Sequence, residues 1–147
     1  TVIAFEDTYL LAVNKDNFER MVQTQPQIVT KLTQLLAERI WFIYKQLANT
    51  LISDPLGRMY DALQMQLEKN KVPIKEGSAY SFEFGPKELI NLVGLPMSTG
   101  SAVVQQMLTN KQFRIVENKI VVNDMMEVIK QAEYYKKMQK LEKARGK

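Results

Sequence analysis

The sequence lacks cysteine and histidine altogether among its 147 residues. Their absence excludes disulfides, thiolate metal sites, zinc fingers and every catalytic system that depends on a histidine base. No apolar run approaches the ~20 residues that a bilayer span requires, and no signal peptide is visible at the N-terminus. We therefore expect no bound metal, no membrane partner and a cytoplasmic location.

Glycine and proline are scarce, with 6 and 5 residues, whereas 46% of the residues are hydrophobic and 24% are charged. This balance is typical of a globular chain, and its length fits one ordinary domain or two small ones. A glycine-rich phosphate loop and a nucleophile–base pair are also missing, so we do not expect an enzyme. The chain does not begin with methionine and opens in strand-like sequence, which indicates part of a longer protein.

The positive charge is concentrated at one end of the chain. Residues 136–147 carry six basic side chains and one acidic side chain, whereas residues 1–53 are balanced and residues 54–135 have one acidic group in excess. A basic tail attracts nucleic acid or acidic membranes, but a solvated helix end has the same composition. Both interpretations of the tail remain open.

Two short strands and a helix are expected before residue 25. The strands cover residues 2–5 and 9–13, and Asn14 is a suitable N-cap for a helix over residues 15–22. Two strands do not form a stable sheet alone, so their partners should lie upstream.

A long helix is predicted from Pro26 to about residue 53. It could be a core helix of a single domain, or it could also pair with a second copy of itself in a coiled coil. We favour the second interpretation, a homodimer, because the apolar stripe is wider than one neighbouring surface needs. The stripe that we expect to dimerise comprises Ile28, Leu32, Leu36, Ile40, Ile43, Leu47 and Leu51.

The remaining segments predict a mainly α fold with small β elements. Asp54-Pro55 ends the long helix, and Asn123 or Asp124 caps a last helix that continues into the tail. Between them we expect helices over 56–68, 86–93 and 96–108 and strand-like segments at 72–74, 80–84, 113–116 and 119–122. Gly94-Leu95 separates two of the helices, and Glu117-Asn118 separates the last two strands. Helix, glycine turn, helix and hairpin together predict a winged helix-turn-helix.

The order of these parts resembles the Crp/Fnr family of bacterial transcription regulators. Residues 7–13 (DTYLLAV) are similar to the last strand of the family's β-barrel, and residues 35–39 (LLAER) are similar to the start of its dimerisation helix. Residues 54–58 (DPLGR) match the family's hinge, and residues 87–94 (KELINLVG) match the first helix and turn of its DNA-reading unit. The resemblance covers nearly the whole chain.

The resemblance implies a homodimeric regulator that binds double-stranded DNA and acts with RNA polymerase. Residues 1–25 would end a cyclic-nucleotide-binding-type barrel, 26–53 would dimerise, 54–135 would bind DNA and 136–147 would form a basic tail. No cofactor is expected in this part, although a cyclic nucleotide is a candidate effector for the upstream domain. Ile43 and Tyr44 stand where the cyclic-AMP-binding member has two hydroxyl side chains, so they are candidate effector contacts. Alternatively, Tyr44 packs with Trp41.

The expected reading helix, residues 96–108, contains no charged residue, so it cannot supply the arginine–guanine contact that is commonest in specific readout. Short polar side chains and a methionine would have to read the bases, while cations elsewhere contact phosphates. The candidate DNA-binding residues are Lys87, Met97, Ser98, Thr99, Ser101, Gln105, Lys111, Arg114 and Lys119. The alternative function is a dimeric winged-helix interaction module with weak or no DNA binding.

Overall fold

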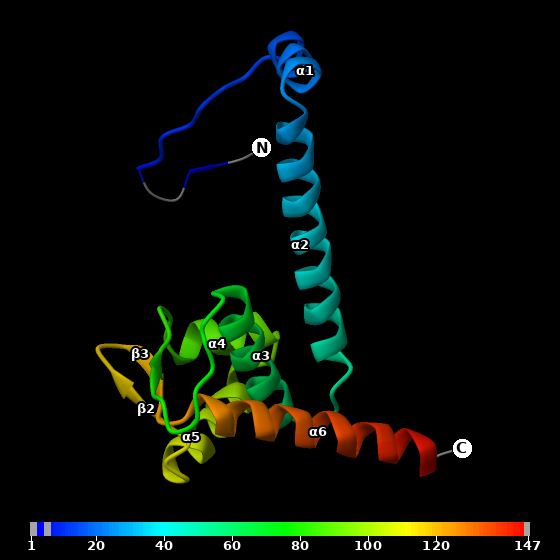
Figure 1. Cartoon of the computed structure of the whole chain (residues 1–147). Helices are drawn as coiled ribbons and strands as arrows, with labels where there is room; N and C mark the ends of the chain where they lie inside the picture. The colour runs from blue at the N-terminus through cyan, green and yellow to red at the C-terminus, as the bar shows by residue number, and fades with distance from the viewer. Residues whose placement is uncertain (1–2, 5–6, 146–147) are drawn as a thin grey trace. The chain divides into compact units, whose positions relative to one another are not determined.

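The computed structural model describes residues 3–4 and 7–145 and divides the chain into two units, Thr1–Ile40 and Trp41–Lys147. Figure 1 shows the course of the chain. Its described helices and strands are α1 (Lys15–Thr24), α2 (Pro26–Thr50), α3 (Pro55–Lys69), β1 (Tyr80–Ser81), α4 (Pro86–Val93), α5 (Met97–Thr109), β2 (Phe113–Val116), β3 (Lys119–Val122) and α6 (Met125–Arg145). The predicted fold class, mainly α with small β elements, is confirmed.

The first unit contains α1 and the first part of α2. Asn14 caps α1 as predicted, because its side-chain oxygen accepts a hydrogen bond from the Asn17 amide at 2.8 Å. The strand predicted over residues 9–13 is wrong, since this segment is irregular and exposed. A strand is stable only where a neighbour pairs with its amides, and the described strands pair only with one another. The strand predicted over residues 2–5 lies mostly outside the described residues, and Ile3 and Ala4 are not in a strand.

Helix α2 ends at Thr50, three residues before the predicted end. The Leu51 and Ile52 amides donate to carbonyls three residues earlier, at 3.1 and 3.0 Å, so the last turn tightens and the helix stops. Leu51 therefore lies just outside the helix that carries the rest of the apolar stripe. Asp54 then starts α3, since its side chain accepts from the Leu56 amide at 2.7 Å.

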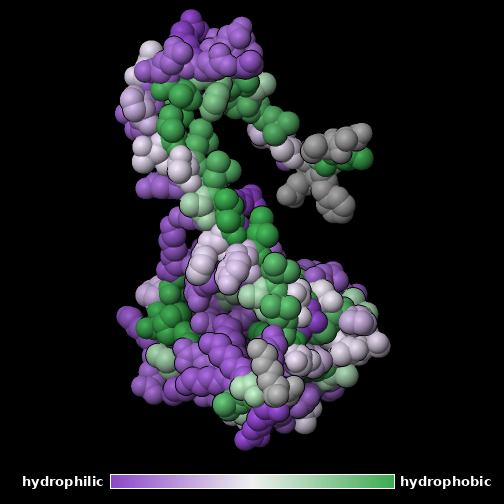
Figure 2. Space-filling model, turned by 90° about the vertical axis from the view of Figure 1, so that its right-hand side faces the viewer, coloured by the Kyte–Doolittle hydropathy of each residue, from purple (hydrophilic) through white to green (hydrophobic). Residues whose placement is uncertain are grey.

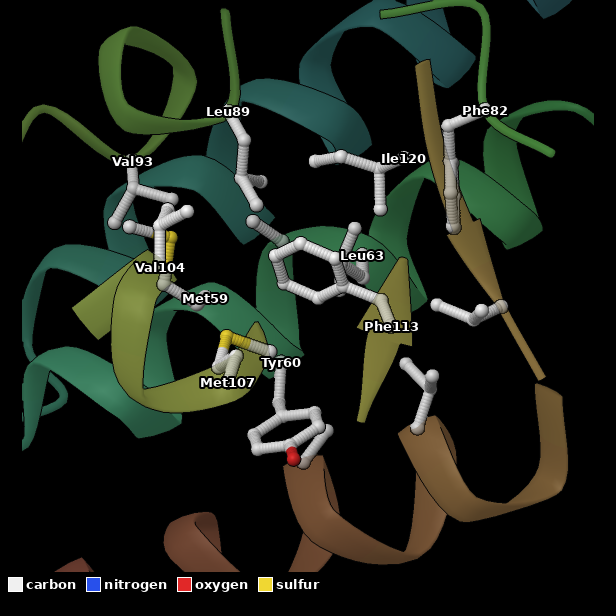
Figure 3. Packing of buried hydrophobic residues seen from close by; sticks show 14 of the residues in the cluster. Met59, Tyr60, Leu63, Phe82, Leu89, Val93, Val104, Met107, Phe113 and Ile120 are labelled. Atoms are coloured by element: carbon white, nitrogen blue, oxygen red, sulfur yellow. The ribbon is translucent and has the colours of Figure 1, made fainter. Parts of the chain in front are cut away.

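One hydrophobic core joins α3 to the elements that follow it. Leu63 and Met59 of α3 lie at its centre, and Figure 3 shows Leu89 of α4, Met107 of α5 and Phe113 of β2 packed around them. All five side chains are almost completely removed from solvent. The core therefore fixes both helices of the helix-turn-helix and the hairpin to a single central helix.

The sheet is antiparallel, with the order β1-β3-β2 and Phe113 opposite Val122 in the hairpin. The predicted strand over residues 72–74 is wrong, because the Val72 amide instead donates to the Leu67 carbonyl and ends α3. The strand predicted over residues 80–84 is shortened to Tyr80–Ser81. The chain beyond Ser81 keeps two backbone bonds to Ile120 but leaves the regular ladder.

Helix α6 begins at Met125, directly after its cap, and includes most of the basic tail. The Asp124 carboxylate accepts from the Met126 amide at 2.9 Å and from the Gly77 amide at 3.1 Å, so Asp124 is the cap, not Asn123. α6 crosses α3 closely, since a Cβ on Gly57 would lie 2.7 Å from Tyr135. In Figure 1 the C-terminal end of α6 lies far from the β2–β3 hairpin. The tail is thus a helix end on the side of the second unit remote from the hairpin.

Candidate nucleic-acid interface

The turn between α4 and α5 depends on glycine at position 94. Gly94 has φ +66° and ψ +35°, a left-handed conformation that glycine adopts without the strain imposed by a Cβ. The amide of Leu95 donates to the Ile90 carbonyl at 3.2 Å and closes the end of α4. The sequence prediction of a tight glycine turn between these two helices is confirmed.

A second glycine allows α5 to approach α4. Gly100 faces Ile90, and a Cβ built on Gly100 would lie 2.5 Å from the nearest Ile90 carbon, which is closer than real side chains approach. Val103, Val104 and Met107 bury the same side of α5 in the core. This packing turns the opposite side of α5 to solvent.

The exposed side of α5 brings together most of the residues that the sequence proposes as readers. Met97, Ser98, Ser101 and Gln105 are all exposed and lie within one face of the helix, since they are separated by one, three or four positions. Thr99 is also exposed but lies toward the edge of this face. The face carries short hydroxyl and amide groups and one thioether, and no charge. It can donate and accept hydrogen bonds and contact methyl groups.

The hairpin β2–β3 forms the wing. Its two turn residues, Glu117 and Asn118, have φ values of +49° and +61°, which is the backbone of a tight type I′ connection. In the register of the two strands, Arg114 and Lys119 share the outer face of the sheet, opposite the face that packs on the core. The wing therefore presents two of the predicted phosphate-binding cations on one surface.

Lys119 is paired with an acidic neighbour that the sequence reasoning missed. Its Nζ lies 2.5 Å from Oε2 of Glu83, and this hydrogen bond, with the Glu83 charge, raises the pKa of Lys119 above its ordinary value. Glu83 belongs to the segment that runs beside β3, and the strand-like composition of residues 80–84 was the sequence feature that pointed to a position in the sheet. Because the pair is exposed to solvent, a phosphate can compete with Glu83 for the lysine.

The other two predicted phosphate contacts are exposed but lie on separate elements. Lys87 is in the first turn of α4, and Lys111 follows α5 with φ +56°. The backbone carbonyl of Lys111 accepts from the Asn123 side chain at 3.4 Å, which joins the end of α5 to the start of α6. The nine candidate residues thus comprise five side chains on the exposed side of α5 and four cations. The cations lie at the start of α4, directly after α5 and on the two strands of the wing.

The predicted dimerisation stripe on α2 is exposed over most of its length (Figure 2). Leu36, Ile43 and Leu47 expose 59%, 61% and 62% of their surface. Leu32, Ile40 and Leu51 are also exposed, and Ile28 is half-buried. Apolar surface of this extent and regular spacing is typical of an interaction face.

The candidate effector residues Ile43 and Tyr44 are both exposed on α2. The Tyr44 ring stacks on the Trp41 ring with a centroid distance of 5.7 Å, which agrees with the packing alternative for Tyr44. Within the described residues, no cluster of three or more acidic side chains has the geometry of a metal site. None of the described helices combines the length and apolar character that crossing a membrane requires.

No family model and no curated protein matches the sequence. Among solved structures, the chain is similar to a CRP/FNR-family transcriptional regulator from Thermus thermophilus, with a TM-score of 0.59 and 22% identity over 74% of this chain and 56% of that one. A CprK variant complexed with OCPA has the same TM-score and 17% identity over 78% of this chain and 52% of that one. The chain spans about half the length of these two proteins.

These similarities agree with the order of elements described above. They confirm, at the level of the fold, the resemblance that the sequence motifs indicated. The chain has a mainly α fold like that of the C-terminal part of CRP/FNR-family transcriptional regulators.

Proposed function

We propose that this chain is the DNA-binding part of a homodimeric transcription regulator. The observation that carries this proposal is the exposed, uncharged polar face of α5, which lies opposite the side that packs on Ile90 through Gly100. The wing of the same unit presents Arg114 and Lys119 on one surface. In winged and two-fold helix-turn-helix proteins the corresponding helix enters the major groove. Here residues 54–135 would bind DNA.

The dimer would place two copies of α5 in successive major grooves. Two-fold helix-turn-helix proteins read half-sites about 34 Å apart, one turn of B-DNA. The exposed stripe on α2 supports this arrangement, because it offers a long self-complementary apolar surface directly before the winged helix. Residues 26–53 would then be the dimerisation segment.

The two kinds of contact should have separable roles. Lys87 and Arg114 would bind phosphates and set affinity for any sequence, whereas Ser98 and its neighbours on α5 would touch base edges. Because α5 has no guanidinium group, it makes no bidentate contact to guanine. One such contact is worth about 1–3 kcal/mol of discrimination between the correct and the wrong base. Sequence preference should therefore be modest and should depend partly on the ease with which a duplex deforms.

Selection from random duplexes tests this division. We expect Ser98→Arg to raise overall affinity and to shift the selected sequences toward guanine, because it adds a cation and a bidentate donor to the reading face. Lys87→Ala should weaken binding about equally for all sequences, as loss of a phosphate contact does. A long guanine-anchored motif for the unaltered protein would contradict the assignment of α5 as the reading helix.

A second candidate function is a dimeric winged-helix protein-interaction module with weak or no DNA binding. The uncharged face of α5 and the pairing of Lys119 with Glu83 favour this alternative, since both reduce the positive charge offered to a duplex. The alternative predicts that the selection at low salt recovers little or no duplex and enriches no sequence, with or without the Ser98→Arg change. Enrichment of a common sequence by the unaltered protein would exclude it.

A further inference from the structure

A cavity of about 290 Å³ lies where the end of α2, the middle of α3 and the basic half of α6 meet. Ala48, Ile52 and Met65 give it an apolar floor, and Leu51 borders it. Four lysines also line it: Lys45, Lys136, Lys140 and Lys143. Its volume lies just below the range of about 300–1,000 Å³ for small-molecule sites, so it suits a compact ligand.

Two of the four lysines are neutralised within the protein. Lys45 is paired with Glu68, and Lys136 is paired with Asp61, whose side chain is only 5% exposed. Among residues 7–145, neither Lys140 nor Lys143 has a hydrogen-bond or ion-pair partner. The cavity therefore combines an apolar floor with an excess of two positive charges.

The walls of the cavity are held together by polar contacts that do not involve these two lysines. The Asn49 side-chain amide donates to the Arg58 carbonyl and to the Asp61 carboxylate, both at 2.8 Å, and connects α2 to α3. Gln139 of α6 donates to the Leu51 carbonyl at the end of α2. Because these contacts already fix the three elements, a ligand would bind without first ordering the site.

We propose that this cavity binds a small organic dianion, a phosphate monoester with a compact apolar group. The apolar group would occupy the floor against Ile52 and Met65, and the phosphate would lie between Lys140 and Lys143. A monoester carries a charge of about −1.5 to −2 near neutral pH, which matches the two unpaired lysines. This assignment depends only on the second unit and is independent of whether α5 binds DNA.

Calorimetric titration of the full chain with phenyl phosphate at about pH 8, where the ester is dianionic, tests the assignment. Inorganic phosphate lacks the apolar group, benzyl alcohol lacks the charge, and benzoate has one charge in place of two. We expect each of the three to bind at least about tenfold more weakly than phenyl phosphate, since each loses one part of the complementarity. Equal affinity for inorganic phosphate or benzoate, or no binding of phenyl phosphate at ~10 mM, would overturn the proposal.

A pair of double variants separates this site from general attraction to the basic helix. Lys140→Gln with Lys143→Gln removes the two cavity cations, and we expect phenyl phosphate to bind at least about tenfold more weakly. Lys137→Gln with Arg145→Gln removes the same charge from α6 outside the cavity lining and should change affinity less than about twofold. Equal losses in both variants would show that the ester binds the tail by its net charge alone. All four positions are accessible to solvent, and circular dichroism verifies that α6 is intact.

Discussion

Replacing Leu36 or Ile43 by lysine is expected to convert the protein from a dimer to a monomer. Both side chains are more than half exposed on the apolar stripe of α2, so the change should not disturb the core of either unit. In the proposed dimer each substitution would bury two lysines, one from each copy, against apolar side chains. Desolvating an unpaired ammonium is costly, and we expect the dimer dissociation constant to rise at least about a hundredfold.

Sedimentation velocity over a range of concentrations measures this effect. Gln34→Lys is the matched control, because Gln34 is exposed on the side of α2 opposite the stripe and the substitution adds the same charge. The control should remain a dimer. A monomer for the unaltered protein at high micromolar concentration, or equal association of all three variants, would rule out dimerisation through α2.

Gly100→Val is expected to destabilise the winged helix by about 3 kcal/mol or more. Even a Cβ at this position would lie 2.5 Å from Ile90, and Ile90 is itself 2% exposed and held in the core. The opposing gain in helix propensity from glycine to valine is only a few tenths of a kcal/mol, about 0.4. The clash therefore dominates, and α5 must shift relative to α4.

Chemical denaturation of a double-mutant cycle tests that explanation. Ile90→Ala alone should cost about 2–5 kcal/mol by leaving a cavity, but together with Gly100→Val it removes roughly the volume that valine adds. We therefore expect the double variant to be more stable than the sum of the two changes by at least about 1 kcal/mol. Ser101→Val, on the exposed face of α5, should have little effect. Strict additivity would mean that the glycine does not determine how the helices cross.

The helix-turn-helix and the wing could be predicted because their signals are local. The turn at Gly94 depends on the left-handed backbone of that one residue. The hairpin turn at Glu117-Asn118 depends on the backbone of those two residues and on the strands on either side of them. Asp54 caps α3 through atoms two and three residues away. In each case the residues that determine the structure are neighbours in the sequence, so the pattern was sufficient.

The sequence could not predict features that depend on distant partners. Residues 9–13 have the composition of a strand, but strand formation requires pairing that this segment does not have. The contact between Lys119 and Glu83 joins positions 36 residues apart, and the tail lysines line a cavity against α2 and α3. The hydrogen bond from Asn49 to Asp61 likewise joins two helices, and no pattern in the sequence singled out Asn49.

The salt dependence of duplex affinity tests the central claim most directly. Each phosphate contact adds about −0.9 to the slope of log affinity against log salt concentration. Lys87, Lys111, Arg114 and Lys119 in both copies of a dimer predict a slope of about −5 to −7, with Lys119 contributing less because Glu83 competes for it. Arg114→Gln should make the slope shallower by about two, one contact in each copy. No duplex binding at ~20 mM salt, or a slope near zero, would contradict the proposal that this chain binds DNA.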